Sequence, residues 1–146
     1  YSVQDYHLHL VCEAADRRAL CRGVQGLSVR LARGLNRLLG RRGKVFADRY
    51  HARALGSPRE VRRTLGYVLN NHLRHGAGRG KRVRPVGADP FSSGPYFAGW
   101  SRPVRVGAVW DPGGLVGVEP RTWLLRVGWR RAGGPLSPWA VPGPAP

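Results

Sequence analysis

Acidic residues are scarce in this sequence. Eight Asp and Glu stand against 25 Lys and Arg, which gives a formal net charge of +17 and a pI near 11.7. Eight carboxylates cannot neutralise the basic side chains. The surplus positive charge therefore either repels itself or faces a polyanion. Nucleic acid is the usual polyanion for a domain this basic, although genome base bias can also produce a composition rich in Arg, Gly, Pro and Ala. The composition therefore favours a nucleic-acid-binding protein.

The sequence also has few cysteines and no long hydrophobic run. Cys12 and Cys21 lack metal-ligand spacing and form no disulfide framework, which is typical of free cytosolic thiols. No stretch approaches the roughly 18 apolar residues of a membrane span, and no signal peptide is recognisable. We therefore expect a cytoplasmic protein without a membrane partner. With 146 residues, the chain can bury one modest core.

Proline and tryptophan are nearly absent from the first half of the chain. Eleven of the twelve prolines and all five tryptophans follow Gly78. This change predicts a regular core over residues 1–78 and a basic extension rich in Trp, Pro and Gly over residues 79–146. For the tryptophans, packing onto the core is preferred to base stacking, because aromatic side chains dominate burial in small segments.

Hydrophobic periodicity within residues 1–78 predicts the order strand, helix, strand, helix. Residues 2–13 alternate with a period of two, as in a half-buried strand. A repeat of three and four then predicts a helix that ends at Gly40 and Gly43. Its apolar face comprises Val24, Leu27, Leu31, Leu35 and Leu38. Residues 44–55 suggest a second strand.

The second helix has a strong start signal. Ser57 is the expected N-cap, Pro58 occupies the first helical position, and Glu60 completes a capping box. This helix is expected to run to about His75. At about 100° per residue, its buried stripe is formed by Val61, Leu65, Val68 and Leu69.

The first chemical motif is His7-Leu8-His9, within the expected first strand. Side chains two residues apart share a face of a strand, and the two Cα atoms lie about 7 Å apart at a rise of about 3.3 Å per residue. Two imidazoles at this spacing can converge on one metal ion. An isolated His-x-His triplet is a weak signal, but here the flanking core positions are apolar and the histidine face is otherwise polar.

The second motif is Tyr67 with Asn71, which are i, i+4 neighbours beside the buried stripe. If the helix packs across the histidine face, the phenol and the amide meet the imidazoles. A protonated tyrosine, with a pKa of about 10, is a poor nucleophile. A divalent ion bound by the histidines and an amide oxygen can polarise a phosphate, which Tyr67 would then attack to form a covalent ester.

Two alternatives weaken this interpretation. On spacing alone, Tyr67 is more often a tyrosine at the border of a core, with its hydroxyl in water. Tyr50, in the Arg49-Tyr50-His51 run, is a rival nucleophile, for which we expect a packing or DNA-backbone role.

With these motifs, residues 2–76 resemble the REP-associated and related single-tyrosine transposases of the HUH superfamily. The matching blocks, in order, are YHLHLVCEA, GLSVRLARGLNRLLG, GKVFADRYHARAL and SPREVRRTLGYVLNNHLRHG. The resemblance implies an α+β fold with a ferredoxin-like antiparallel sheet and flanking helices, here expected to lack its first strand and helix. His72 departs from the pattern, because members often carry proline after the motif asparagine.

The resemblance also assigns roles to the motif residues. His7 and His9 match the histidine pair, Asn71 matches a third metal-side ligand, and Tyr67 matches the nucleophile. It implies Mg²⁺ or Mn²⁺ as cofactor, single-stranded DNA with hairpin ends as substrate, and a 5′-phosphotyrosine intermediate with a free 3′-OH. We therefore expect a DNA transposase that acts as a monomer or homodimer. A non-catalytic nucleic-acid-binding module and an inactive transposase remnant remain as alternatives.

Basic residues outside these motifs are candidates for contacts with DNA phosphates. They are Arg30, Arg33, Arg37, Arg41, Arg42, Arg49, Arg79, Lys81, Arg82 and Arg84. The run over residues 79–84 is dense and follows the expected core directly, which favours tracking of a DNA backbone. For the arginines of the first helix, a solvated face is an equally good interpretation.

Overall fold

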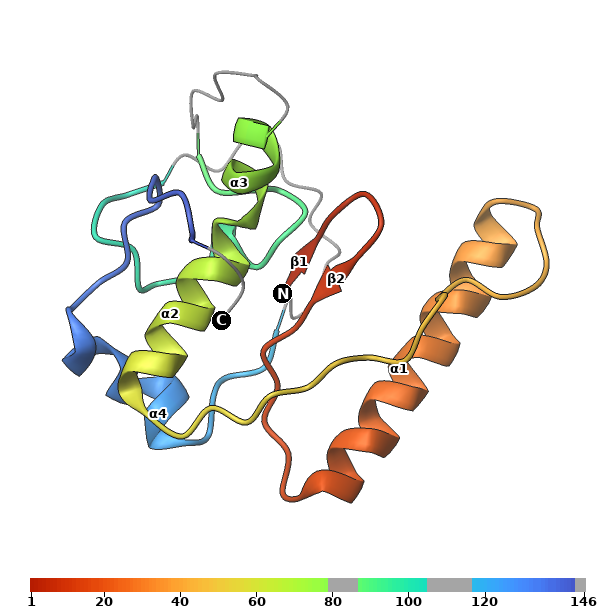
Figure 1. Ribbon diagram of the computed structural model, residues 1–146, viewed down its shortest axis with the longest axis horizontal. Coiled ribbons are helices and arrows are strands. Elements are labelled where there is room, and N and C mark those ends of the chain that lie inside the picture. Colours follow the sequence, from red (N-terminus) through yellow and green to blue (C-terminus); the bar gives the residue numbers. More distant parts are fainter. Residues whose placement is uncertain (79–86, 105–116, 144–146) are drawn as a thin grey trace. The chain divides into compact units, whose positions relative to one another are not determined.

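The computed structural model describes residues 1–78, 87–104 and 117–143, and its described part mixes helices with a two-stranded antiparallel sheet (Figure 1). The chain divides into two compact units: unit 1 comprises Tyr1–Val11 and Leu55–Pro146, and unit 2 comprises Cys12–Ala54. The units therefore do not follow the expected boundary at residue 78. The elements in order are β1 (Ser2–Val3), β2 (Leu8–His9), α1 (Arg17–Leu38), α2 (Pro58–Leu69), α3 (Asn71–Gly78), η1 (Gly94–Tyr96), α4 (Trp123–Arg126) and η2 (Gly128–Ala132).

The prediction of one strand over residues 2–13 is wrong, because the chain folds back within it. Ser2 pairs with His9 and Val3 with Leu8 in an antiparallel hairpin. The backbone N–H of Gln4 donates to the carbonyl of His7 at 2.9 Å and closes the turn. A single strand has unpaired backbone groups on both edges, whereas folding back pairs one edge of each half.

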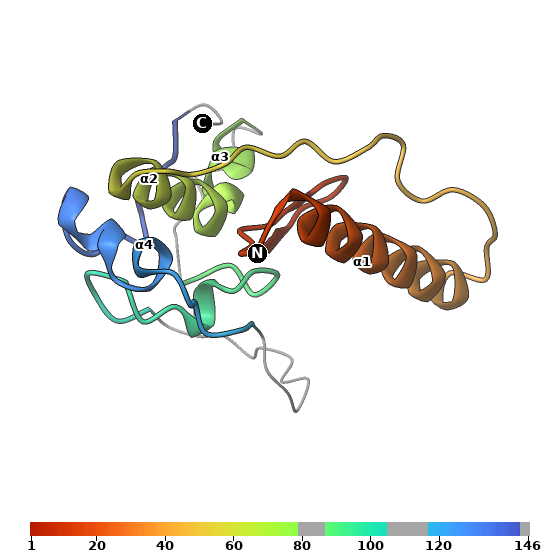
Figure 2. The same ribbon diagram turned by 90° about the horizontal axis from the view of Figure 1, so that it is seen from below.

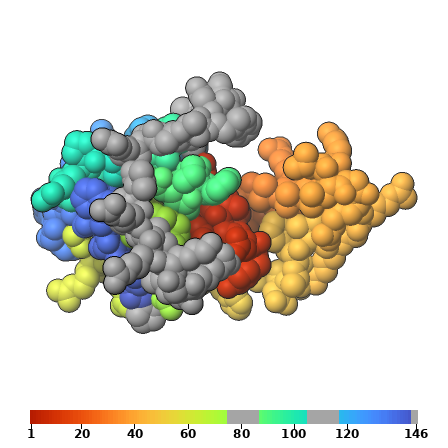
Figure 3. Space-filling view, turned by 90° about the horizontal axis from the view of Figure 1, so that it is seen from above, coloured from red at the N-terminus to blue at the C-terminus, as the bar shows by residue number. Residues whose placement is uncertain are grey.

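A segment near residue 92 covers the second edge of β1. The N–H of Val3 donates to the carbonyl of Phe91 at 2.9 Å, and the N–H of Ser93 donates to the carbonyl of Tyr1 at 3.0 Å. Between them, Ser2 and Ser92 form an antiparallel bridge. In the space-filling view, green atoms of this part of the chain lie against the red atoms of the hairpin (Figure 3). Residues beyond the expected boundary therefore hold the hairpin in place.

Helix α2 begins where its capping signal predicts. The Ser57 hydroxyl accepts from the N–H of Glu60 at 3.3 Å, and the Glu60 carboxylate accepts from the N–H of Gly56 at 3.0 Å. The expectation of one helix to about His75 is wrong, because α2 ends at Leu69 and α3 starts at Asn71. Asn70 lies between them with φ −104° and ψ 12°, away from the helical value of ψ near −42°.

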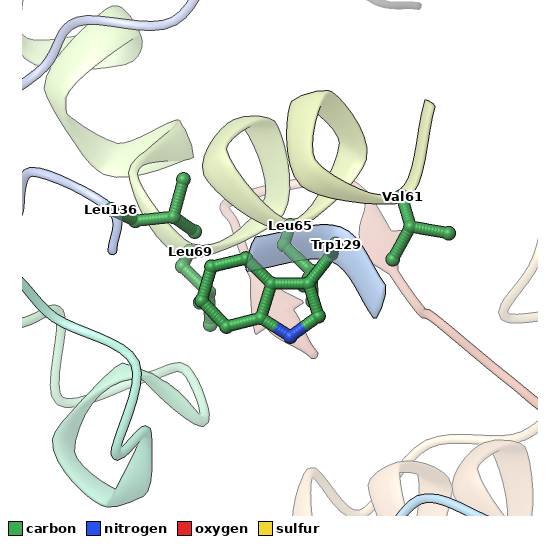
Figure 4. Close-up of a cluster of buried hydrophobic side chains, with 5 residues drawn as sticks. All are labelled: Val61, Leu65, Leu69, Trp129 and Leu136. Carbon is green, nitrogen blue, oxygen red and sulfur yellow. The ribbon is translucent and has the colours of Figure 1, made fainter. Parts of the chain in front are cut away.

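The core of unit 1 joins α2 to the C-terminal part of the chain. Val61, Leu65 and Leu69 pack with Trp129 and Leu136, and the Trp129 ring lies beneath the apolar face of α2 (Figure 4). Helix α4 also lies along α2 in both ribbon views (Figure 2). The predicted buried stripe of Val61, Leu65, Val68 and Leu69 is confirmed.

The prediction that the tryptophans pack onto the core is confirmed for two of them. Trp129 is 2 % exposed, and Trp100 packs against the same cluster. Trp123 and Trp139 are 48 % and 39 % exposed. Trp110 lies outside the described residues.

Unit 2 consists of α1 and the chain that follows it. Asp16 caps the helix by accepting from the N–H of Ala19 at 2.7 Å, and the helix ends at Leu38, just before Gly40 as expected. The predicted strand over residues 44–55 is wrong: this segment is irregular, since unit 2 contains no described strand with which it could pair. In the part of the chain that the structure describes, no helix is both long and apolar enough to cross a bilayer.

Candidate active site

Four polar side chains of unit 1 meet between the hairpin and the α2–α3 junction. The ring centroids of His7 and His9 lie 4.6 Å apart, with an interplanar angle of 72°. The centroid of the Tyr67 ring lies 5.2 Å from that of His9. On the other side, Asn71 Nδ2 contacts His7 Nε2 at 3.4 Å. The contacts therefore run in the order Tyr67, His9, His7, Asn71.

The hairpin positions the histidine pair. His9 lies in β2, and His7 lies at the end of the turn that precedes it. The rings lie on one side of the backbone, as the His-x-His spacing predicts for an extended chain. The hairpin is anchored in turn through β1 and Phe91, so the histidines are held by a backbone ladder rather than by a loose terminus.

The junction between α2 and α3 positions the tyrosine and the asparagine. Tyr67 lies in the last turn of α2, where it is partly buried beside the core stripe. Asn71 begins α3 and is 0 % exposed. A buried amide is costly unless its polar atoms find partners. Asn71 Oδ1 is buried and has no hydrogen-bond partner in the described part of the chain.

This geometry fits a divalent metal ion. A nitrogen ligand lies about 2.1 Å from a metal. When the two metal–nitrogen bonds form a right angle, the centroids of two imidazole rings therefore lie about 4.5 Å apart. The centroids of His7 and His9 are 4.6 Å apart. The unpartnered Oδ1 of Asn71 supplies an oxygen donor beside this pair, directly or after a half-turn of its amide. Among the described residues, no group of three or more His, Cys, Asp and Glu gathers. An ion here would therefore have two imidazoles and one amide as protein ligands.

Comparison of the chain with known protein families, with curated proteins and with solved structures finds no match. The function of this chain is therefore inferred from the geometry of the site and from the motifs in the sequence.

Tyr50, the rival nucleophile, has a different environment in unit 2. Its hydroxyl lies 2.9 Å from Cys21 Sγ, and either atom can donate in this hydrogen bond. The bond with Cys21 is the main cause that raises the pKa of Tyr50 above its ordinary value, while Arg17 acts in the opposite direction. A raised pKa makes the reactive phenolate of Tyr50 less accessible. The Tyr67 ring, by contrast, contacts the His9 ring of the candidate site.

The candidate phosphate-binding arginines lie mainly on α1 and in the loop after it. One open face of α1 carries Arg22, Arg30 and Arg33, together with Gln25, Gly26 and Val29. Arg37, Arg42 and Arg49 are exposed. Arg41 is exposed as well, but its guanidinium donates to the carbonyl of Lys44 at 3.1 Å and so supports the loop. Arg79, Lys81, Arg82 and Arg84 lie outside the described residues.

Two residues near the site, Asp89 and Asn70, were not assigned a role from the sequence. The Asp89 carboxylate accepts from the Phe91 N–H at 2.9 Å and from Gln4 Nε2 at 3.2 Å, which ties the hairpin turn to the segment that covers β1. Its sequence signal is the Asp-Pro-Phe-Ser-Ser run, because an aspartate before a proline favours the start of a turn. Asn70 had a weaker signal, since two consecutive asparagines at the end of an apolar stripe disfavour a continuous helix.

Proposed function

We propose that this protein is a single-tyrosine DNA transposase that cleaves and rejoins single-stranded DNA with hairpin ends. One observation carries the proposal: Tyr67 of α2, the hairpin residues His9 and His7, and Asn71 of α3 contact one another in series. A tyrosine at the border of a core needs no such neighbours, so this grouping favours the catalytic interpretation over the simple packing role.

We also propose that unit 1 contains part of a ferredoxin-like antiparallel sheet. The β1–β2 hairpin, with the Phe91 segment on its outer edge and α2 beside it, is compatible with such a sheet. In that arrangement His9 lies in the sheet, His7 lies at the end of the turn before it, and Tyr67 lies on a helix that contacts His9. Sites built on such elements hold their geometry better than sites on loops.

His7, His9 and the Asn71 oxygen would hold Mg²⁺ or Mn²⁺. When bound, the ion supplies positive charge that polarises the scissile phosphate and stabilises the charge of the transition state. The imidazoles must be neutral to bind it. The Asn71 amide is buried and contacts the His7 ring.

In the proposed reaction, Tyr67 Oη attacks the phosphorus of a DNA phosphodiester. A bond from Oη to phosphorus forms, and the bond from phosphorus to the 3′-oxygen breaks. The phenol loses one proton and the departing 3′-oxygen gains one, so the step is balanced without an added nucleotide. The product is a 5′-phosphotyrosine ester with a free 3′-OH, and attack by another 3′-OH reverses the step and joins the strands.

A second candidate function is a non-catalytic nucleic-acid-binding module, which also describes an inactive remnant of a transposase. The net charge of +17 and the open face of α1 that carries Arg22, Arg30 and Arg33 favour it, because both suit phosphate contacts and neither needs a nucleophile. The two candidates share DNA binding and differ only in covalent chemistry.

Covalent capture of DNA separates these candidates. The purified chain is incubated with labelled single-stranded hairpin DNA and Mn²⁺, with and without EDTA, and is run on a denaturing gel. We expect a metal-dependent band that protease shifts and that Tyr67→Phe reduces by at least about 10³-fold, since removal of a nucleophile removes the covalent step. DNA retention in native gels is expected to stay within about twofold, because the substitution removes only the hydroxyl and the aromatic ring remains.

Tyr50→Phe is the matched control and is expected to leave the covalent band intact. If the covalent band persists in Tyr67→Phe and disappears in Tyr50→Phe, Tyr50 is the nucleophile. Retention of DNA in native gels without any covalent band would establish the non-catalytic module instead.

A further inference from the structure

One face of α2 and α3 holds the C-terminal segment, residues 133–143. Four residues spaced by four define this face: Arg62, Gly66, Asn70 and Arg74. Arg62 donates to the carbonyls of Gly133, Gly134 and Pro135, each at 3.2 Å. Gly66 leaves room for Leu136, and Arg74 donates to the carbonyl of Gly143. The segment therefore runs along the helices in the direction of the site.

Asn70 makes the central contacts of this face. Its Nδ2 donates to the carbonyl of Ser137 at 2.9 Å and to that of Ala140 at 3.1 Å, so both of its amide hydrogens are used. The side chain is 2 % exposed. An amide buried without such bonds carries a desolvation cost that is not recovered. The two carbonyls therefore fix where the Asn70 side chain lies, and with it the backbone at this residue.

The backbone at Asn70 is also where α2 is interrupted. Its ψ is 12°, whereas a residue inside a helix has ψ near −42°, a difference of about 50°. The next residue is Asn71, whose amide contacts His7. A helical Asn70 would rotate Asn71 about the helix axis and carry its amide away from the hairpin. The direction of Asn71 thus depends on the conformation of Asn70.

We propose that Asn70 is a positioning residue, and that residues 137–140 of the C-terminal segment are a structural part of the site. By binding the carbonyls of Ser137 and Ala140, Asn70 holds the interruption between α2 and α3 that directs Asn71 toward His7. The role of Asn71 in the reaction rests on the proposed function. The dependence of the contact between Asn71 and His7 on Asn70 does not, and it can be measured without DNA or metal.

The experiment compares three full-length variants by NMR. Asn70→Ser removes both donated bonds, and Asn70→Asp does the same with a side chain of nearly the same shape, should Asn70→Ser fail to unfold cooperatively. Arg62→Met is the matched control: it removes three bonds to the same C-terminal segment but lies two turns away from Asn71. The signals observed are the Asn71 side-chain amide, the His7 ring and the cross-peak between them.

We expect the cross-peak to be lost in the Asn70 variants and kept in Arg62→Met. Mn²⁺, added as the chloride, should broaden the His7 and His9 ring signals at a concentration at least about tenfold higher in the Asn70 variants, in line with the effect of removing support from metal ligands. An unchanged cross-peak in the Asn70 variants, or an equal loss in Arg62→Met, would overturn the inference. If the cross-peak depends on Asn70 but wild type neither responds to Mn²⁺ nor captures DNA, Asn70 still positions Asn71, and the proposed function is the part that fails.

Discussion

At the scale of single residues, His72 is a partly buried histidine next to the candidate site. It follows Asn71 in α3, and burial lowers its pKa below the ordinary value of 6.5, while the charge of Asp89 and the backbone of Leu69 act in the opposite direction. The folded state therefore prefers a neutral imidazole at this position.

The first prediction concerns the pH dependence of stability. The unfolded chain binds a proton at His72 more readily than the folded chain does, so stability rises with pH through this range. We expect the free energy of unfolding in urea to fall as pH is lowered from about 7.5 to about 5.5, and to fall less steeply in His72→Gln. His51→Gln, at an exposed position of unit 2, is the control and should keep the wild-type slope. Equal slopes in wild type and His72→Gln would show that His72 is not the group responsible.

At the scale of elements, local signals were reliable where one short motif determines the backbone. The capping box at Ser57 and the glycine after α1 set helix ends by contacts within four residues. Period-two alternation was less informative, because a strand needs a partner that the pattern does not name. Residues 2–13 turned back on themselves, and residues 44–55 have no described strand in their own unit with which to pair.

The second prediction concerns the start of α2. Ser57→Ala removes the side-chain acceptor for the N–H of Glu60, and is expected to lower the free energy of unfolding by about 1 kcal/mol. Glu60→Gln is the control, since its amide oxygen can still accept from Gly56, and its loss should be smaller. Both are measured as shifts of the urea midpoint at constant m-value. If Glu60→Gln costs as much as Ser57→Ala, the carboxylate charge rather than the cap stabilises this helix start.

At the scale of the whole molecule, the C-terminal extension is part of the core of unit 1. Trp129 and Leu136 fill the apolar face of α2, and backbone groups near Phe91 and Ser93 pair with β1. A fragment that ends near residue 78 would expose that apolar face and one edge of the hairpin. The extension thus supports both elements that carry the candidate site.

The third prediction tests this integration. Trp129→Ala is expected to lower the free energy of unfolding by about 3–5 kcal/mol, because it leaves a large cavity against α2. Trp139→Ala removes the same side chain from a position that is 39 % exposed, and should cost much less. Urea unfolding followed by circular dichroism measures both. Similar losses for the two variants would mean that the extension packs less specifically than the cluster around Trp129 indicates.

The sequence by itself determined the local features: the start of α2, its buried stripe of Val61, Leu65, Val68 and Leu69, the end of α1, and the proximity of His7 to His9. Each of these depends on backbone periodicity or on contacts within a few residues. Only the tertiary structure decided which distant segments meet. It placed Tyr67 against His9, directed Asn71 to His7 across the interruption at Asn70, and inserted Trp129 under α2. These contacts join residues about 60 apart in the chain, and whether they form depends on how the whole of unit 1 packs, which no local pattern encodes.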